Sequence, residues 1–495
     1  MINRYNLNEK EITLKSDLAG EFPLYIYISE AKELLLYSTS IKELLNDKSV
    51  IKPLEVTSEG ISFLLQSGVV PLPKTVYKNI FIISIGHSAM IKTINNKIDI
   101  EFSYDFPFFN ENRGEESEVD EEYILEILAE ATISKVQEDK PSYLFHSAGK
   151  DSNSIALALA EAGYQDRITS VSHQGKGEKD ESEIAKQLAT KLGFKHEKIY
   201  EPKVLEQKDK DNINYYFENI PFPCMDTASL AYPLYTTQLE FNNSNIIDGM
   251  GNDVHIGHIP DRVEYNKQQY FSRLHHLRPL AGKLSSGSRL EIATSTRVEW
   301  VGLMGLTYGD TRELLTDATD VYNYWKEIDK QNSDRDYLDV RASIRGVSVD
   351  QEIFTRKVRN FSDITDSNLI LPWASQKVAE YFSKLPEKHL FDREGLKNKL
   401  FLRKMLKDRL GLDSDKLGKM AYGFSFYNIL LMMQKEVNYE MYTCKLWNEK
   451  GIENVLNNLY QKIENNHRSK ERAKTLIQRI YLLSAWYNNN YYLRG

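Results

Sequence analysis

The amino-terminal part of the chain contains short apolar runs separated by polar turns, a pattern that predicts β-strands. Residues 22–37 read FPLYIYISEAKELLLY, two runs rich in Tyr, Ile and Leu around a polar turn at 29–32. A second region, 76–100, contains strand-like runs around the polar turn 95–97. These patterns predict a small domain built on β-sheet.

The pattern changes after Phe109. Residues 110–122, NENRGEESEVDEE, are acidic and lack an apolar period, which predicts a solvated linker. Beyond it, the predicted helices cover 123–137, 155–162 and 181–192, and the predicted strands cover 143–146, 168–172 and 196–200. Strands alternating with helices predict βαβ units and a parallel sheet. Helical patterns dominate from about residue 266 onward.

Composition indicates a globular enzyme-sized chain. The 495 residues include 63 Lys plus Arg against 71 Asp plus Glu, a formal net charge of −8. This mild acidity argues against a nucleic-acid surface. No apolar run reaches membrane-spanning length, and residues 1–15 lack the hydrophobic block of a signal peptide, so we expect a cytoplasmic protein. Cys224 and Cys444 stand outside any CxxC context, which excludes a disulfide framework and predicts reduced, structural thiols.

The most informative stretch is 143–159, YLFHSAGKDSNSIALAL, in which a hydrophobic strand leads through a turn of small residues into a helix. Backbone N–H groups at such a helix N-terminus favour an anion. The hydroxyls of Ser147 and Ser152 can donate to phosphate oxygens, and Gly149 permits close backbone approach. Asp151 would repel phosphate unless a cation lay between them, which predicts a magnesium ligand. A plain helix cap is the alternative interpretation.

The turn SAGKDS resembles the SGGxDS signature of the ATP pyrophosphatase superfamily, with Ala148 in place of a glycine. Residues 246–258, IIDGMGNDVHIGH, are similar to the GEGxDExxGG loop of class B asparagine synthetases. This resemblance implies ATP and Mg²⁺ as cofactors and makes Asp253 the second magnesium ligand beside Asp151. It also places Lys150 in the nucleotide-binding turn.

Further matches extend along nearly the whole chain. LILPW at 369–373 stands where the family has ExRxPFLD, KLFLR at 399–403 resembles KxxLR, and KMAYGF at 419–424 resembles the loop KxxxGF. On this resemblance Lys419 is the expected catalytic lysine, which stabilises charge on pyrophosphate and on the tetrahedral intermediate. Ser172 and Gly249 are expected to contact adenine or ribose, because strand ends of an open α/β sheet face the ligand crevice.

The resemblance implies the fold class α/β, with a parallel-sheet synthetase domain, a helical C-terminal part and a shortened glutaminase-like β-rich domain. We expect the domains to cover 1–112 and 120–495. Glutamine-dependent relatives need an N-terminal cysteine, whereas Ile2 follows Met1 here. No glutaminase activity is therefore expected. β-Lactam synthetases, carbapenam synthetases and lasso-peptide cyclases are the cysteine-free members of the family.

The general base is missing at the positions where the family would have it. Met250 replaces the glutamate or catalytic tyrosine of the second motif, and Asn368 stands near the glutamate position of ExRxPFLD. His255, next to Asp253, is the expected substitute, with His258 as the alternative.

These features predict an AMP-forming carbon–nitrogen ligase that adenylates a carboxylate and joins it to an amine, in macrolactam, lactam or peptide maturation. The expected partners are a carboxylate substrate, either a small molecule or a peptide, and an amine nucleophile. A biosynthetic partner protein is a further possibility. We expect binding to neither nucleic acid nor membrane. Ammonia-dependent amidation of a small acid or sugar acid is the first alternative. An RNA-acting superfamily member would need basic patches or CxxC pairs, and an inactive nucleotide-binding relative would not need to keep Asp151 and Asp253.

Overall fold

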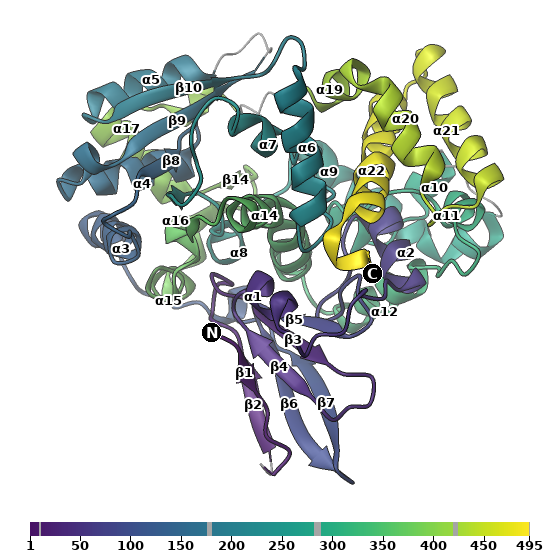
Figure 1. Cartoon of the computed structure of the whole chain (residues 1–495). Helices are drawn as coiled ribbons and strands as arrows, with labels where there is room; N and C mark the ends of the chain where they lie inside the picture. Colours follow the sequence, from purple (N-terminus) through teal and green to yellow (C-terminus); the bar gives the residue numbers. More distant parts are fainter. Residues whose placement is uncertain (9–10, 176–180, 282–288, 419–423, 495) are drawn as a thin grey trace.

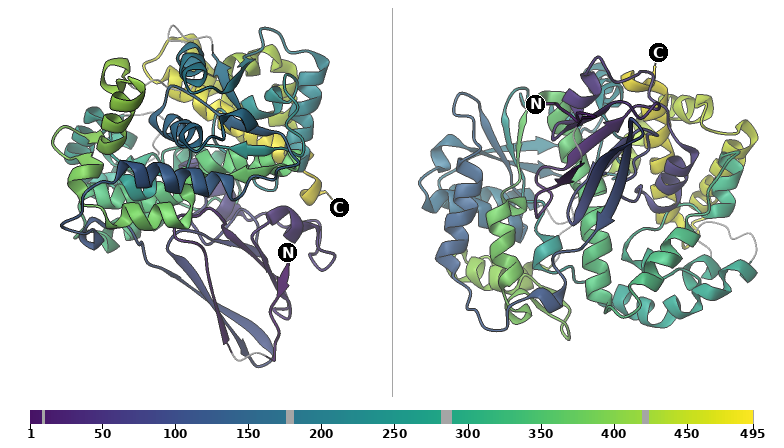
Figure 2. Two further views of the ribbon diagram at one scale, coloured as in Figure 1. Left: turned by 90° about the vertical axis from the view of Figure 1, so that its left-hand side faces the viewer. Right: turned by 90° about the horizontal axis from the view of Figure 1, so that it is seen from below.

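The computed structural model describes residues 1–8, 11–175, 181–281, 289–418 and 424–494. Two β-sheets from the start of the chain project from one end of a larger α/β and helical body (Figures 1 and 2). Within the described residues the strands are β1 Asn3–Arg4, β2 Glu11–Lys15, β3 Leu24–Ile28, β4 Leu35–Ser38, β5 Ile80–Ile83, β6 His87–Ile94, β7 Lys97–Tyr104, β8 Ser142–Phe145, β9 Thr169–Gln174, β10 Lys195–Tyr200, β11 Asn245–Ile247, β12 Asn368–Ile370, β13 Phe391–Asp392 and β14 Lys397–Asn398.

Helices make up most of the rest of the described chain. Up to the end of the parallel sheet they are α1 Ile41–Asn46, α2 Ser58–Ser67, α3 Glu121–Ile133, α4 Lys150–Glu161, α5 Glu181–Lys191, α6 Gln207–Asn219, α7 Ala231–Tyr235, α8 Asp253–Ile256, α9 Arg262–Phe271, α10 Arg289–Ala293, α11 Tyr308–Leu314, α12 Tyr322–Gln331, α13 Tyr337–Arg341 and α14 Arg356–Thr365. The later ones are α15 Gln376–Lys384, α16 Glu387–Leu390, α17 Leu400–Leu410, α18 Ser414–Leu417, α19 Phe426–Met432, α20 Gln434–Thr443, α21 Glu449–Glu464 and α22 Lys470–Asn489. None of the helices in the described ranges is both long and apolar enough to cross a membrane.

The amino-terminal strands confirm the predicted β-rich region. β3 and β4 pair antiparallel around the polar turn, with Tyr25 opposite Ser38. β6 and β7 form the second hairpin, and Asn95 and Asn96 at its turn have φ of 52° and 60°. Asparagine tolerates this left-handed region better than most residues, which explains why the chain reverses there. The strand orders are β1-β4-β3-β5 and β2-β6-β7.

The central sheet confirms the predicted fold class. Its strands are all parallel, in the order β10-β9-β8-β11-β12. β8, β9 and β10 lie where the sequence predicts strands, and α4 and α5 cover the predicted helices. Because parallel strands end at one edge, the loops after β8 and β11 emerge side by side.

Helices bury both faces of this sheet. On one face Ile155 and Leu159 of α4 share a core with Leu128 of α3 and Met405 of α17. On the other, Val171 of β9 belongs to a core that also holds residues of α7 and α14. β11 is buried throughout, as expected of a strand covered on both faces, whereas β9 and β10 nearer the sheet edge contain more polar residues.

The division into 1–112 and 120–495 stays a prediction. One apolar core contains residues from both segments. Contacts also cross between them: Trp325 Nε1 donates to Ser67 Oγ at 2.8 Å, and the Tyr77 hydroxyl donates to the carbonyl of Pro221 at 2.5 Å. The acidic connection itself is mostly exposed, but Arg113 is fastened through hydrogen bonds to the carbonyl oxygens of Phe382 and His255.

Candidate active site

The turn between β8 and α4 is held by its own polar groups. Ser147 Oγ accepts a hydrogen bond from Gly149 N at 3.0 Å, and Ser152 Oγ accepts one from Ser147 N at 3.2 Å. Asn153 Nδ2 donates to the carbonyl oxygens of Ser147 and Gly149 at 2.9 and 2.7 Å. These bonds fix the turn at the N-terminus of α4, where N–H groups and the helix dipole favour an anion.

The loop after β11 packs directly against this turn. A Cβ on Gly249 would lie 3.1 Å from Ser152 N and 3.3 Å from Asp151 Cβ. Farther along, a Cβ on Gly251 would lie 2.7 Å from the Cβ of Ala374, and its φ of +103° already favours glycine. Gly249 lets the two loops approach this closely, and Gly251 lets the same loop pack against the segment after β12, because neither glycine carries a side chain.

The two carboxylates that the sequence pairs lie on either side of one buried lysine. Lys399 Nζ is 2.8 and 2.7 Å from the two carboxylate oxygens of Asp151, and 2.7 Å from Asp253 Oδ1. Asn252 joins the group, since its Nδ2 donates to Asp151 Oδ1 at 2.6 Å and its Oδ1 accepts from Lys399 at 3.0 Å. A single positive charge therefore binds both carboxylates.

The charges of this group reinforce one another. Burial alone would lower the pKa of Lys399, but Asp151 and Asp253 raise it above its ordinary value. Burial would raise the pKa of Asp253, yet the net pKa is well below the usual range, chiefly because of Lys399. Carboxylate oxygens and the amide oxygen of Asn252 are the hard ligands that Mg²⁺ prefers. The donor set therefore fits a magnesium ion, which would take the position between the two aspartates that Lys399 Nζ fills in this structure.

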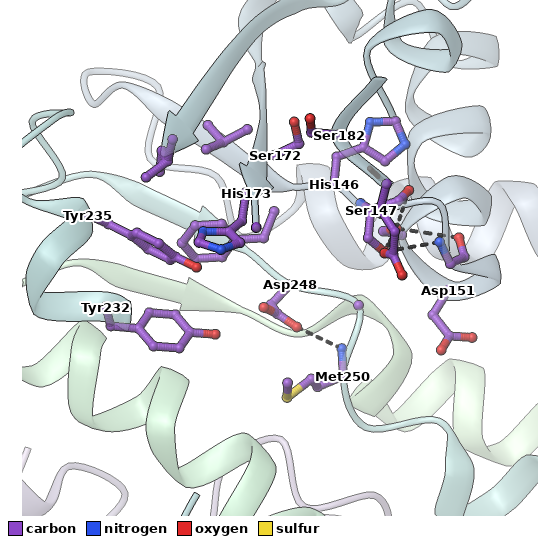
Figure 3. Close-up of a pocket in the computed structure, with 18 of the residues that line it drawn as sticks. His146, Ser147, Asp151, Ser172, His173, Ser182, Tyr232, Tyr235, Asp248 and Met250 are labelled. Carbon is purple, nitrogen blue, oxygen red and sulfur yellow. Dashed lines mark hydrogen bonds between the residues drawn. The ribbon is translucent and has the colours of Figure 1, made fainter. Parts of the chain in front are cut away.

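A pocket of about 280 Å³ opens beside this group (Figure 3). One wall is the phosphate-type turn, with Ser147, Gly149, Asp151 and Ser152. The remaining lining is largely apolar and aromatic, and includes Phe145, Val171, Ile199, Tyr232 and Tyr235. An apolar pocket with a few convergent polar groups is typical of small-molecule sites.

Asp248 enters the same pocket from the end of β11. Its side chain lies between the tyrosines on one side and the Ser147 turn on the other (Figure 3). Its Oδ1 accepts a hydrogen bond from Met250 N at 3.0 Å, and the residue is only 6% exposed. Burial raises the pKa of Asp248 to about 6, although Lys357 acts in the opposite direction. A buried carboxyl with a near-neutral pKa in a pocket is a functional-site candidate.

The other expected nucleotide contacts lie at or near the pocket. Ser172 on β9 lines it, and its hydroxyl is hydrogen-bonded to His196 Nε2 at 3.1 Å. Gly249 also lines it. Lys150 begins α4 outside the lining, and its pKa is lowered to about 8 by burial and then by Arg403 and Lys399. This concentration of positive charge suits a polyphosphate chain.

The structure does not place His255 where the sequence interpretation needs it. Its ring lies between Phe108 and Phe382, outside the pocket lining, and neither ring nitrogen has a hydrogen-bond partner among the described residues. Burial lowers its pKa to about 3. Sequence proximity to Asp253 misled the interpretation, because the short helix α8 directs the imidazole into an apolar core.

His258 belongs to a charged network instead. Arg341 Nε donates to His258 Nδ1 at 3.1 Å, and Arg345 Nε approaches Nε2 at 3.0 Å. Asp350 Oδ2 lies 3.0 Å from the same Nε2. Burial lowers the pKa of His258. With guanidinium groups at both ring nitrogens, this histidine is poorly placed to receive a substrate proton.

The remaining expected residues fall into three situations. Lys419 lies outside the described residues. Met250 lines the pocket. Asn368 lies at the start of β12, where its Nδ2 donates to Asn245 Oδ1 at 2.9 Å and to the carbonyl of Lys135 at 2.7 Å. The Asn368 amide therefore links the amino ends of β12 and β11, at the edge of the sheet opposite the pocket.

Sequence reasoning missed the two most telling side chains. Lys399 was visible only as the first residue of KLFLR, and Asp248 only as the residue before Gly249 in the stretch 246–258. The sequence signal for Asp248 was an acidic residue that follows an apolar strand and precedes Gly249 and Gly251. For Lys399 no local pattern indicates that its ammonium reaches two distant aspartates.

A pocket at the carboxyl edge of a parallel sheet, with an anion-binding turn and paired carboxylates, defines an α/β domain of nucleotide-binding type. The chain belongs to the asparagine synthase family, which matches residues 123–412. No curated protein matches the chain. Membership implies an ATP-dependent carbon–nitrogen ligase that takes a carboxylate and an amine or ammonia. The matched region contains the whole parallel sheet and both loops.

Proposed function

We propose that this chain is an AMP-forming amide ligase that adenylates a substrate carboxylate and couples it to an amine without hydrolysing glutamine. We place it in specialised biosynthesis, in lactam, macrolactam or peptide maturation. The observation that carries the proposal is the joint presence of the Ser147–Ser152 turn and the Asp151–Asp253 pair beside one pocket. The turn and the carboxylate pair lie together even though Met250 and Asn368 replace residues that the family motifs contain.

The chain's own groups account for the first half-reaction. The turn and the N-terminus of α4 bind the phosphates, and Ser147 and Ser152 orient them. Mg²⁺ between Asp151 and Asp253 would neutralise charge on the departing pyrophosphate. Lys399 and Lys150 add positive charge beside it, and we propose that Lys419 contributes there too. The carboxylate substrate attacks the α-phosphorus, and an acyl-adenylate and pyrophosphate result.

Pyrophosphate exchange into ATP tests this proposal directly. The natural chain is screened with Mg²⁺ against pools of carboxylic acids. We expect exchange that depends on one acid and falls at least about 100-fold in Asp151→Asn, which removes a charged ligand of the ion. Glu161→Gln is the matched control, because that carboxylate lies at the other end of α4 and pairs with Arg409 near the surface.

The outcomes separate the alternatives. Product formation that needs added ammonium would favour amidation of a small acid or sugar acid, whereas loss of water from an acid that carries its own amine would favour cyclisation. ATP binding without exchange against any pool would favour an inactive nucleotide-binding relative and overturn the proposal. Exchange that survives in Asp151→Asn would remove the role assigned to the carboxylate pair.

A further inference from the structure

The second half-reaction needs a proton acceptor that the family positions do not supply. An amine that attacks the acyl carbon must lose a proton as the amide forms. Met250 has no titratable group, and Asn368 lies at the opposite edge of the sheet. His255 and His258 lie in an apolar core and an arginine network. The acceptor must therefore be sought among the groups that face the pocket.

The pocket offers few groups able to act in this way. Both ring nitrogens of His146 are engaged, at 2.9 Å each, by Ser170 Oγ and Asn153 Oδ1. Asp151 is bound by Lys399 and Asn252. The buried Tyr232 and Tyr235 have pKa values well above their ordinary value, because of burial first and Asp248 second. Three groups remain on the described lining: the carboxylates of Asp248 and Glu181 and the imidazole of His173. The His173 ring packs against Tyr235 and Phe424, with centroids 5.7 and 6.0 Å apart, on the aromatic wall rather than beside the Ser147–Ser152 turn (Figure 3).

Position favours Asp248 over Glu181. Asp248 is adjacent in the chain to Gly249, where an added Cβ would lie 3.1 Å from Ser152 N and 3.3 Å from Asp151 Cβ. A group bound to the Ser147–Ser152 turn is therefore next to it, and Figure 3 shows the carboxylate between that turn and the aromatic wall. Glu181, at the start of α5, is engaged by the backbone N–H of Ala148. It lines the pocket from the start of α5, whereas Asp248 lines it from the end of β11.

We propose that the Asp248 carboxylate is the general base of amide formation. The amine nitrogen attacks the acyl carbon of the adenylate, the C–N bond forms, and the proton of the amine passes to a carboxylate oxygen of Asp248. The C–O bond to the phosphate then breaks and AMP leaves with that electron pair. This inference rests on the proposed function, since it assigns a residue to the second half of the same reaction.

The surroundings of Asp248 suit this role. Lys357 of α14 faces it with positive charge, and Asp151 of α4 with negative charge. The tyrosines come from α7. Lys357 Nζ is itself held 2.5 Å from Asp226 Oδ2. Burial raises the pKa of Asp248 to about 6, so the carboxylate is ionised at neutral pH and still basic enough to take a proton.

The test compares the two half-reactions in one variant. Pyrophosphate exchange with the acid identified by the screen reports adenylation, and amide formation with ammonium, or with the acid's own amine, reports the second step. We expect Asp248→Asn to retain exchange and to lose about 100-fold or more in amide formation. Hydroxylamine, a nucleophile that is neutral near pH 7 and needs less help, should still yield hydroxamate in this variant. Retained exchange also shows that the variant is folded.

The pH profile gives a second readout. Amide formation by the natural chain should rise as pH increases through about 6, because the ionised carboxylate is the active form. This rise of the rate with pH should be absent in Asp248→Asn and restored in Asp248→Glu. In Lys357→Met the rise should move to higher pH, because the ammonium that lowers the pKa of Asp248 is gone.

Three results would overturn the inference. Equal loss of exchange and amide formation in Asp248→Asn would make the carboxylate a nucleotide-binding group, for example toward ribose hydroxyls. Undiminished amide formation in that variant would remove it from the reaction. If Glu181→Gln instead retained pyrophosphate exchange and lost amide formation, the general base would be Glu181. Absence of exchange in the natural chain is a different failure, because it refutes the proposed function itself.

Discussion

Replacing Lys399 with methionine isolates the charge that joins the two aspartates. The Lys399 side chain is 6% exposed, and Asp151 and Asp253 are 31% and 37% exposed. Methionine keeps most of the length and apolar contact of the lysine stem but removes the ammonium. Asp151 and Asp253 would then face each other without a counter-charge.

The expected cost follows from this geometry. Removing one partner of a buried ion pair costs about 3–5 kcal/mol. Because water reaches about a third of each carboxylate, we take the lower end, about 3 kcal/mol. At roughly 2.1 cal/mol/K of unfolding entropy per residue, a unit at least as long as the matched region 123–412 loses about 1–2 °C of Tm for each kcal/mol. Lys399→Met should therefore unfold about 3–6 °C below the natural chain when no divalent ion is present.

Magnesium provides the decisive comparison. In the natural chain Lys399 competes with Mg²⁺ for the position between the carboxylates, whereas in Lys399→Met that position is open to the ion. Differential scanning fluorimetry without nucleotide should therefore show a larger Mg²⁺-induced rise in Tm for the variant than for the natural chain. Lys404→Met is the matched control: Lys404 lies on α17, which begins directly after Lys399, its side chain is 70% exposed, and its ammonium pairs with Glu121 and Asp408.

Two results would refute this reasoning. An unchanged Tm in Lys399→Met would show that the ammonium does not hold the carboxylates together. Equal Mg²⁺ shifts in both proteins would show that the ion binds elsewhere. The control should show the same Tm as the natural chain, because exposed ion pairs contribute little to stability.

Three further predictions concern the loops and the thiols. Gly249→Ala should lower pyrophosphate exchange about 10–100-fold, because its Cβ would lie 3.1 Å from Ser152 N and displace the turn; unchanged steady-state exchange would contradict the close approach of the two loops. Gly251→Ala should destabilise the chain by about 1–3 kcal/mol in urea unfolding, since its Cβ would lie 2.7 Å from that of Ala374 at a left-handed φ; an unaltered midpoint would argue against that contact. Cys224 and Cys444 should resist iodoacetamide at pH 8 until the chain is unfolded, because burial raises their pKa values to about 11 and about 12; rapid labelling of the native chain, measured by mass spectrometry, would show that the thiols are accessible.

The sequence alone determined the local elements and the first half of the site. Apolar runs on either side of polar turns predicted the β3–β4 and β6–β7 hairpins, and asparagines lie at the turn between β6 and β7. Strand, small-residue turn and helix in immediate succession identified the anion-binding turn, because a helix N-terminus favours anions whatever surrounds it. These features depend on residues close together in the chain, and so a local pattern contains them.

Tertiary structure decided which distant groups meet. Lys399 reaches Asp151 and Asp253 only because β11 pairs with β8 and α17 packs against α4. Asp248 faces the pocket and His255 an apolar core, although both adjoin the same motif. Side-chain direction at a strand end or in a one-turn helix depends on backbone angles that no periodicity specifies, and the pKa of a carboxyl depends on what surrounds it once folded.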